Sequence, residues 1–157
     1  MRTLAAAAAL AVLLPLAALL PAGARAEEEY ATTKDAELMV HQAIAFLRKE
    51  GKEKALAVFN DPKGQFTYRD LYIMAYDLNG TCLAHGAKKE RVGKNLMEDR
   101  DVDGKQFVKE RIAIAKQHGK GWQEYKWQNP VTRKTEQKVA YFERAGDVVV
   151  VCGAYKK

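Results

Sequence analysis

The sequence predicts an α+β domain, built from a five-stranded antiparallel sheet with helices on its faces. Three observations predict it: helical spacing of apolar residues over residues 32–50 and 105–119, a hairpin dipeptide at Asn79-Gly80, and three strand-like runs after residue 120. This order of helices and strands is typical of an antiparallel sheet covered by helices. The length of 157 residues fits one such domain.

The first helix is expected to begin at Thr32, which stands three residues before Asp35 in the spacing of a capping box. Its core face is made of apolar residues at helical spacing, namely Ala36, Met39, Val40, Ala43, Ile44, Phe46 and Leu47. Gly51 stops or bends this helix, and a second helical piece is expected over residues 52–60.

A third helix is expected over residues 105–119, with Gly119 as its C-terminal cap. The apolar stripe that would face the sheet consists of Phe107, Val108, Ile112 and Ala115. Residues 86–103, which precede this helix, carry no periodic pattern and are expected to form a loop.

The first two strands are expected over residues 71–78 and 81–85, joined by a two-residue turn at Asn79-Gly80. The other three are expected over residues 121–128, 135–144 and 148–155. The final run, VVVVCGAY, is apolar on both faces, and a strand without a polar face is covered on both sides. It is therefore expected at the centre of the sheet.

The first 26 residues are expected to be a cleavable secretory signal peptide, which leaves residues 27–157 as the domain. A positively charged start precedes an uncharged apolar run over residues 4–21 and an A-x-A site ending at Ala26. An uncleaved membrane anchor is the alternative, but the run is near the short limit for a membrane span and Pro15 interrupts it. The expected location is the periplasm, and secretion from the cell is left open.

The charge pattern argues against nucleic-acid binding. The chain has 26 Lys and Arg against 20 Asp and Glu, and loss of Arg2 and Arg25 with the signal peptide would lower the formal net charge from +6 to +4. These charges are mixed along the chain and form no basic stripe with interleaved aromatic residues. A solvated surface of mixed charge is expected.

Seven sequence blocks in a fixed order resemble one known family. They are KALAVFNDPKGQF (residues 54–66), DLYIMAYDLNGTCLAHG (70–86), VGKNL (92–96), DVDGKQFVKE (101–110), GWQEYKWQNP (121–130), the Lys138/Tyr141 pair and VVVCGAY (149–155). With these blocks the chain resembles a PAS-like extracytoplasmic sensor domain and, more closely, the single Cache domain family, type 2.

The resemblance implies ligand binding. Cache domains hold small organic acids or similar metabolites in a pocket between the sheet and the helix-loop layer, and they are usually fused to a chemoreceptor or histidine kinase. Only Lys156 and Lys157 follow Tyr155 here, with no second membrane span and no signalling module. The chain is therefore expected to pass its signal to a separate partner, such as a membrane receptor or kinase.

Lys138 is the residue expected to bind the charge of the ligand. A lysine within a strand usually faces solvent, but both faces of a PAS-like sheet tend to be covered, so a lysine there needs a partner such as a bound carboxylate. Tyr125 and Trp127 share one strand face and are expected either to pack in the core or to form the pocket wall, where the hydroxyl and the indole N–H would orient a ligand. Trp122, on the other face, is expected in the core.

Tyr72, His85 and Tyr141 complete the predicted ligand-binding set. Tyr72 shares a strand face with Tyr76 and belongs to either the core or the pocket. Tyr141 lies three residues after Lys138, so in a regular strand it faces the opposite side, and joint contact needs a bulge or a strand end. His85 ends a strand, where a structural histidine is favoured over a carboxylate contact or a pH sensor.

Cys82 and Cys152 are an even pair in a chain expected to be exported, which permits a disulfide. In the PAS-like strand order their strands are next-but-one neighbours, about 9.6 Å apart, whereas a disulfide needs Cα atoms within about 7 Å. Free, buried thiols are therefore favoured. Cys82 and His85 would face opposite sides of one strand, which disfavours a metal site, and no metal or cofactor is expected.

Binding is expected here, and catalysis is not, because the sequence has no G-x-S-x-G, P-loop or H-E-x-x-H motif. The predicted function is a periplasmic sensory domain for a short carboxylate, with ligand-dependent closure or stiffening of residues 86–104. The alternative is an interaction module that keeps the fold without a small-molecule ligand. A thiol enzyme would need an exposed and reactive Cys82.

Overall fold

The computed structural model describes residues 30–156, so the predicted signal peptide lies outside the described residues. Its five-stranded antiparallel sheet has the order β4-β3-β7-β6-β5. The strands are β3 (Met74–Asp77), β4 (Cys82–His85), β5 (Lys120–Gln128), β6 (Thr135–Ala145) and β7 (Val148–Tyr155). This is the predicted α+β architecture.

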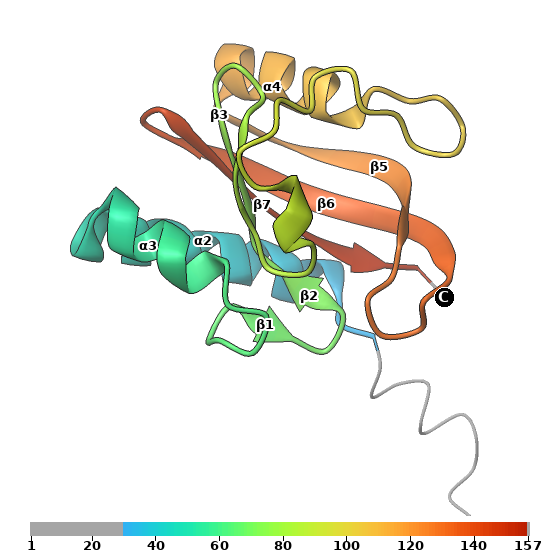
Figure 1. The fold of residues 1–157 in the computed structure, drawn as a ribbon, viewed down its shortest axis with the longest axis horizontal. Coiled ribbons are helices and arrows are strands. Elements are labelled where there is room, and N and C mark those ends of the chain that lie inside the picture. The colour runs from blue at the N-terminus through green and yellow to red at the C-terminus, as the bar shows by residue number, and fades with distance from the viewer. Residues whose placement is uncertain (1–29, 157) are drawn as a thin grey trace, which may run out of the picture.

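Helical layers cover both faces of the sheet (Figure 1). Helix α2 (Thr33–Glu50) packs on β6 and β7, with α3 (Lys52–Phe59) beside it. Helix α4 (Phe107–His118) packs on β5 and β6 on the other face, preceded by a long loop that contains the short 3₁₀ turn η1 (Lys89–Arg91). Within residues 30–156, no helix combines the length and the apolar character that a membrane span requires.

The helix ends follow the sequence signals. The Asp35 amide donates to the Thr32 hydroxyl over 3.1 Å, and the Thr32 amide donates to the Asp35 carboxylate over 2.9 Å, which is the predicted capping box. Gly51 ends α2, and Gly119 ends α4 with φ +78°, in the left-handed region that glycine adopts without strain.

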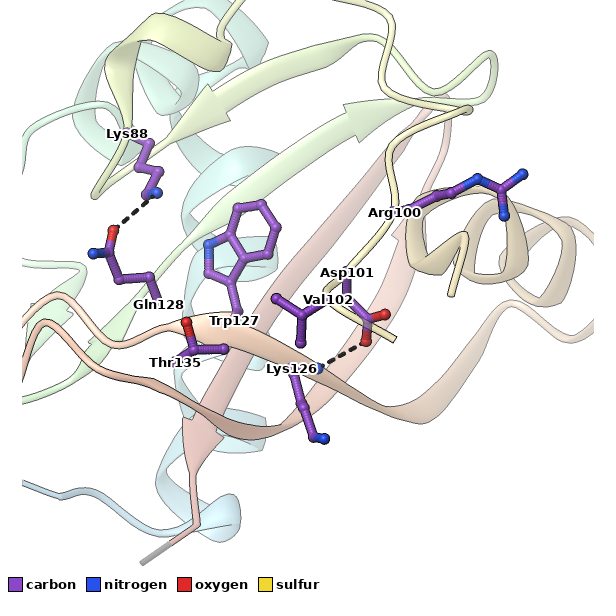
Figure 2. A pocket seen from close by; sticks show the side chains of 8 residues that line it. All are labelled: Lys88, Arg100, Asp101, Val102, Lys126, Trp127, Gln128 and Thr135. Atoms are coloured by element: carbon purple, nitrogen blue, oxygen red, sulfur yellow. Dashed lines mark hydrogen bonds between the residues drawn. The ribbon is translucent and has the colours of Figure 1, made fainter. Parts of the chain in front are cut away.

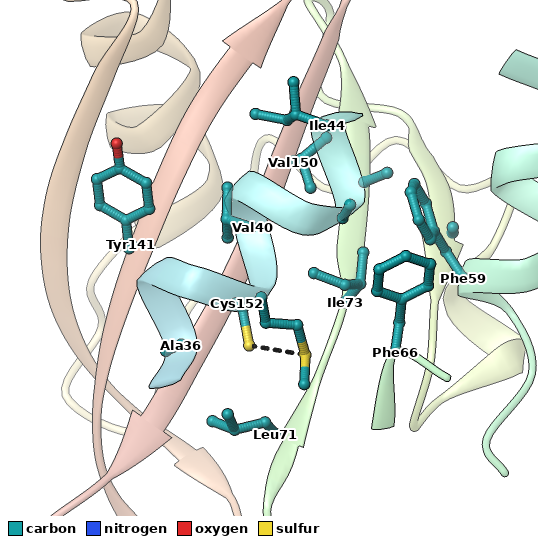
Figure 3. Close-up of a cluster of buried hydrophobic side chains, with 14 of the residues drawn as sticks. Ala36, Val40, Ile44, Phe59, Phe66, Leu71, Ile73, Tyr141, Val150 and Cys152 are labelled. Atoms are coloured by element: carbon teal, nitrogen blue, oxygen red, sulfur yellow. Dashed lines mark hydrogen bonds between the residues drawn. The ribbon is translucent and has the colours of Figure 1, made fainter. Parts of the chain in front are cut away.

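Strand β7 is central and all eight of its residues are buried, as its apolar pattern predicts. Towards α2, Val150 and Cys152 pack with Val40 and Ile44 (Figure 3). Towards α4, Val149 and Val151 pack in a second core cluster that includes Phe107, Ile112 and Phe142. The sheet therefore separates two cores, and the second contains the candidate site.

The hairpin between β3 and β4 forms, but its turn is wider than the predicted two-residue turn. The Asp77 carbonyl accepts from the Gly80 amide over 3.2 Å, and only Gly80, at φ +82°, has a positive φ in this turn. The Asp77 side chain also accepts from the Asn79 and Thr81 amides, each at 2.8 Å. These side-chain bonds stabilise a wider turn, with glycine alone at the left-handed position.

Two further expectations need correction. The predicted strand over residues 71–78 is divided, because β2 (Leu71–Tyr72) pairs with β1 (Thr67–Tyr68) in a small separate sheet. Trp122 is not a core residue: it lies on the edge strand β5, is 44% exposed and contacts Tyr141 with ring centroids 5.0 Å apart.

Cys82 and Cys152 are free and buried, as predicted. Strand β3 lies between their strands, and the two thiols belong to different cores, Cys82 towards α4 and Cys152 towards α2. The Cys152 thiol lies 3.7 Å from the Met39 sulfur. Burial raises the pKa of both thiols, to about 11 for Cys82 and about 12 for Cys152, so both stay protonated and unreactive at neutral pH.

Candidate functional site

Lys138 is fully buried on the α4 side of the sheet. Its Nζ lies 3.9 Å from the centroid of the Tyr72 ring and 4.6 Å from that of the Tyr155 ring, and it donates to the Tyr155 hydroxyl over 3.3 Å. Within residues 30–156, no carboxylate forms an ion pair with this amine. An ammonium has three donors, so most of its hydrogen-bonding capacity is unused.

The hydroxyl groups around Lys138 form a directed chain. The Tyr155 hydroxyl donates to the Gln128 carbonyl over 2.8 Å, so it accepts from Lys138 and also from the Tyr72 hydroxyl, 3.3 Å away. Tyr155 thereby joins the end of β7 to the end of β5. This residue was absent from the predicted site, because an apolar run ending in tyrosine looks like core.

Gly153 makes room for the lysine. A Cβ at this position would lie 2.7 Å from Cε of Lys138 and 2.9 Å from Cβ of Ala140. Both distances are shorter than real Cβ contacts, so only glycine lets the Lys138 side chain lie across β7 in this way.

Burial, with a smaller contribution from the positive charge of Arg111, lowers the pKa of Lys138 to about 7, while Cys152 and Asp70 act in the opposite direction. Asp70 is itself buried, and burial raises the pKa of its carboxyl group. Its two oxygens accept from the Ala31 amide at 2.7 Å and the Tyr155 amide at 3.2 Å. Asp70 therefore connects the segment before α2 to the strand that bears Tyr155.

His85 also lies against this group, with its ring stacked on Tyr72 at 5.1 Å and 25°. Its Nδ1 accepts from the Ala87 amide at 3.3 Å and from the Lys88 amide at 3.0 Å, so the neutral ring carries its proton on Nε2. Burial, together with the charge of Lys138, holds the pKa of His85 well below its ordinary range. The ring is thus a neutral structural element, with only Nε2 left for a ligand.

We expect acid to destabilise the protein through His85. Because its pKa is lower in the folded state than the unfolded value of about 6.5, the unfolded state binds more protons as the pH falls below 6.5. Between pH 6.5 and 5 this costs roughly 1.5 kcal/mol of unfolding free energy. In His85→Asn the amide oxygen keeps an acceptor near Nδ1 and does not titrate. Urea unfolding of both proteins should show that the free energy of unfolding falls less between pH 6.5 and 5 in the variant. An equal fall in both proteins would contradict the role of His85 in acid destabilisation.

Tyr125 and Trp127 extend the site along β5. The Tyr125 ring stacks on Phe107 with centroids 4.5 Å apart, and Trp127 meets the same phenylalanine edge-on at 5.3 Å. The Trp127 indole N–H is buried with no hydrogen-bond partner among the described residues. Trp127 also lines an outer pocket of about 160 Å³, where it stands beside the Lys88–Gln128 hydrogen bond (Figure 2). Trp127 therefore lies between this surface pocket and the interior.

Tyr141 is not part of this group. The β5–β6 and β6–β7 registers run without a break through residues 138–143, so Tyr141 faces α2 while Lys138 faces α4. Its ring contacts His41 at 5.5 Å and its hydroxyl donates to Glu143 over 2.9 Å. Joint contact of Lys138 and Tyr141 with one ligand required a bulge or a strand end. Because β6 is regular between these two residues, the predicted joint contact is wrong.

Arg111, on the inner face of α4, was not among the predicted site residues. This side chain is fully buried, and its Nε and both Nη atoms lack hydrogen-bond partners among the described residues. Its guanidinium carbon lies 5.3 Å from the Tyr125 ring centroid, 5.5 Å from that of Tyr76 and 5.7 Å from that of Phe107. Position 111 falls on the predicted apolar stripe of this helix. A charged residue on an apolar stripe is the sequence signal that could have revealed a buried arginine.

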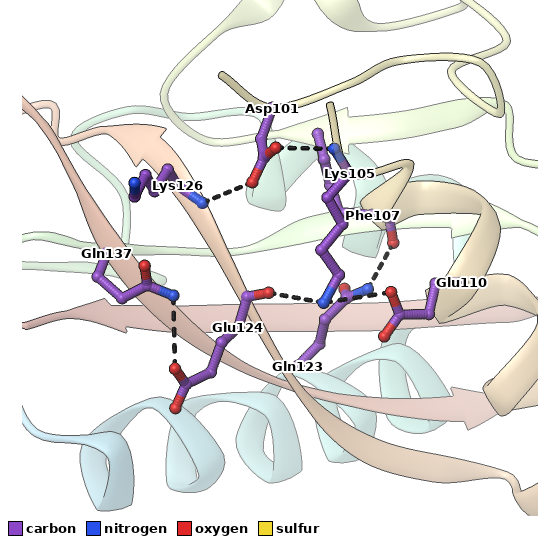
Figure 4. A network of polar contacts seen from close by, with 8 residues as sticks. All are labelled: Asp101, Lys105, Phe107, Glu110, Gln123, Glu124, Lys126 and Gln137. Atoms are coloured by element: carbon purple, nitrogen blue, oxygen red, sulfur yellow. Dashed lines mark hydrogen bonds and ion pairs between the residues drawn. The ribbon is translucent and has the colours of Figure 1, made fainter. Parts of the chain in front are cut away.

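The second half of the loop is fastened to the sheet (Figure 4). The Asp101 carboxylate accepts from the Lys105 amide at 2.9 Å and from the Lys126 amide of β5 at 3.0 Å. Lys105 reaches the Glu124 carbonyl over 2.8 Å, and the Gln123 amide group donates to the Phe107 carbonyl over 2.9 Å. The loop over residues 86–104, for which ligand-dependent closure or stiffening was expected, is thus held at its C-terminal end.

Comparison with known proteins identifies the family. The family described as Single Cache domain 2 matches residues 24–157. The chain belongs to the single Cache domain family. The predicted resemblance is therefore confirmed, and the domain is a Cache sensor domain.

Solved Cache domains share its fold. One, described as "Structural basis for carboxylic acid recognition by a Cache chemosensory domain", superposes with a TM-score of 0.70 at 19% identity, covering 85% of this chain and 96% of that one. A methyl-accepting chemotaxis protein from Vibrio parahaemolyticus RIMD 2210633 has a TM-score of 0.67 at 24% identity, covering 78% and 86%. At these identities the likeness establishes the fold alone.

One curated relative is a much longer protein. The sensor histidine kinase MctS from Rhizobium johnstonii is 36% identical over 73 residues, which is 46% of this chain and 16% of the kinase. The chain thus matches only a small part of that relative's length.

Proposed function

We propose that this Cache domain binds a short organic carboxylate between the sheet and the helix-loop layer, and that it signals binding to a separate receptor or kinase. The observation that carries the proposal is Lys138, a fully buried amine that has hydroxyl and aromatic neighbours but no carboxylate partner among the described residues. Burying an unpaired cation is costly. A bound carboxylate would supply the missing charge.

The neighbours of Lys138 suit such a ligand. The Tyr72 and Tyr155 hydroxyls lie 3.3 Å apart beside the amine and can turn towards a carboxylate oxygen. Tyr125 and Trp127 provide aromatic walls, and the unpartnered indole N–H is a further donor. His85 supports Tyr72 by stacking on it. The solved Cache domain described as recognising carboxylic acids makes this ligand class the natural first test.

Loop residues next to the site can transmit binding. Lys88 bridges to Gln128 over 3.2 Å, and Lys88 and Arg91 lie 5.2 and 4.8 Å from the Trp127 ring centroid. Since residues 93–96 bond to the β3–β4 hairpin and Asp101 holds the far end of the loop, ligand-dependent movement would be confined to residues 86–92, which would change the surface presented to a partner.

The cellular location of the domain and the kind of partner are also part of the proposal. We place the domain in the periplasm after signal-peptide cleavage, in line with a solved neighbour described as the periplasmic sensor domain of a chemotaxis protein. The receptor and kinase relatives support a partner of the same kind. Binding without catalysis fits the two buried, protonated thiols.

A thermal-shift screen of the purified chain against short carboxylates, amino acids and amines tests the proposal. A carboxylate at 100 times its dissociation constant should add about 2.7 kcal/mol, which raises the melting temperature by about 5–10 °C. If no carboxylate in the panel binds, the proposal fails, and the alternative of an interaction module without a small-molecule ligand is favoured.

Three tyrosine variants locate the bound ligand. Tyr72→Phe and Tyr155→Phe each remove one hydroxyl beside Lys138 and should weaken carboxylate binding roughly 10- to 150-fold, as loss of a hydrogen bond to a charged group does. Tyr141→Phe makes the same chemical change on the α2 side and should leave affinity unchanged. Titration calorimetry measures all three. Equal losses in the three variants would contradict the site.

A further inference from the structure

Arg111 is a second buried cation on the same side of the sheet as Lys138. Its exposed fraction is 0%, and all three of its side-chain nitrogens lack hydrogen-bond partners within residues 30–156. No carboxylate among the described residues forms an ion pair with it. The guanidinium is a cation, and within residues 30–156 no anionic group compensates its charge.

Packing alone does not account for Arg111. The three nearest rings lie 5.3–5.7 Å from its guanidinium carbon, near the outer limit of about 6 Å for a cation–π contact, and such contacts use none of its five donors. Burial raises the pKa of Tyr125 and the nearby Arg111 opposes that rise, but no guanidinium nitrogen meets the Tyr125 hydroxyl with the distance and angle of a hydrogen bond. An apolar residue would fit the stripe of α4 at lower cost.

Arg111 and Lys138 approach the same tyrosine ring, that of Tyr125, from opposite layers. Tyr125 is directly opposite Lys138 in the β5–β6 register, and the same Tyr125 ring is the aromatic group nearest to Arg111. The Arg111 charge also reaches Lys138, since it contributes to the lowered pKa of the amine. One cation is therefore fixed to the sheet and the other to α4, with a tyrosine ring beside both.

We infer that the ligand of this site is a short dicarboxylate, with one carboxylate on Lys138 and the other on Arg111. The inference rests on the proposed carboxylate-binding function and narrows it. The planar fork of a guanidinium matches a carboxylate with two parallel hydrogen bonds, while the ammonium is a compact point charge. A dianion satisfies both cations, whereas a monocarboxylate leaves one unpaired in the interior. It also links α4 to the sheet.

The test compares two four-carbon acids that differ by one carboxylate, succinate and butyrate, by titration calorimetry on the purified chain. Succinate should bind at least tenfold more tightly. Arg111→Met should remove that preference while leaving butyrate affinity within about threefold. Arg48→Met makes the same substitution at an exposed position of α2 and should change neither affinity. Far-UV circular dichroism and melting temperature establish that each variant is folded.

The outcomes separate the two proposals. If butyrate binds as tightly as succinate, or if the succinate preference survives Arg111→Met, the dicarboxylate inference is wrong while carboxylate binding stands. If Arg111→Met does not fold, Arg111→Lys replaces it: a lysine keeps the charge and loses the fork, so the preference should fall without vanishing, and an unchanged preference would overturn the role of Arg111. If neither acid nor any other carboxylate binds, the proposed function itself fails.

Discussion

Replacing Lys138 with methionine should abolish carboxylate binding and, in the same chain, stabilise the ligand-free fold at neutral pH. Affinity should fall about 100-fold or more, because the variant loses the charged donor while the ligand's carboxylate would still have to leave water. Methionine fills similar space in the groove over Gly153 and removes an amine that is buried without an acidic partner.

The pH dependence of stability gives the same substitution a second readout. Lys138 has a pKa of about 7 in the folded state and about 10.4 when unfolded, so between these values the unfolded state binds more protons. Stability of the native chain therefore rises with pH, by roughly 1.5 kcal/mol between pH 7 and 8.5. Towards the upper end of this range the thiols of Cys82 and Cys152 begin to act in the opposite direction, because they ionise at about pH 8.5 when unfolded and only at higher pH when folded.

Urea unfolding at pH 7, 7.5, 8 and 8.5 checks this expectation, with Lys120→Met as the control at an exposed position of β5. The native chain and the control should show the rise in stability, and Lys138→Met should lack it. Retained carboxylate affinity in Lys138→Met would mean that the anion is held elsewhere, and a retained rise in stability would mean that another group titrates.

Asp70→Ala should be the most destabilising single substitution near the site, with a loss of about 3–5 kcal/mol. The buried carboxylate accepts from the Ala31 and Tyr155 amides, so the variant leaves two donors unpaired where the chain segments meet. It also removes the acid whose charge favours the protonated form of Lys138. A loss of this size is a large part of a typical stability of 5–15 kcal/mol.

The control is Asp147→Ala, since Asp147 is an exposed acid paired with Lys52 at the surface. Surface pairs contribute at most about 1 kcal/mol, so this variant should unfold close to the native urea midpoint. The double variant Asp70→Ala/Lys138→Met should be more stable than Asp70→Ala alone, because it also removes a buried amine whose charged form Asp70 no longer favours. Similar losses in Asp70→Ala and Asp147→Ala would contradict the bridging role of Asp70.

Much of the fold was predictable because its signals are local. The Thr32–Asp35 capping box, the glycine ends of the helices and the two apolar faces of β7 each depend on a few neighbouring residues. Strand alternation alone also places Lys138 and Tyr141 on opposite faces of β6, and the register agrees. The width of the turn at Gly80 was not predicted, because it depends on the hydrogen bonds that the Asp77 side chain accepts from the Asn79 and Thr81 amides.

The unpredicted parts of the site depend on residues far apart in the sequence. Asp70 has its partners at Ala31 and Tyr155, and no local pattern marks such a bridge. Arg111 was passed over because a charged residue on a helix normally faces solvent. Its burial follows only from the packing of α4 against β5, which places it beside Tyr125.

The position of β7 has a consequence for the order in which the molecule can assemble. This strand is central in the sheet but last in the sequence, and it pairs with β3 on one side and β6 on the other. Until it leaves the ribosome, the emerging chain can form the β3–β4 and β5–β6 hairpins but cannot join them. Closure of the sheet must therefore wait for β7, and it proceeds at the slower pace of long-range strand pairing. A chain that stops before Val148 would consist of two separate hairpins, with neither core closed.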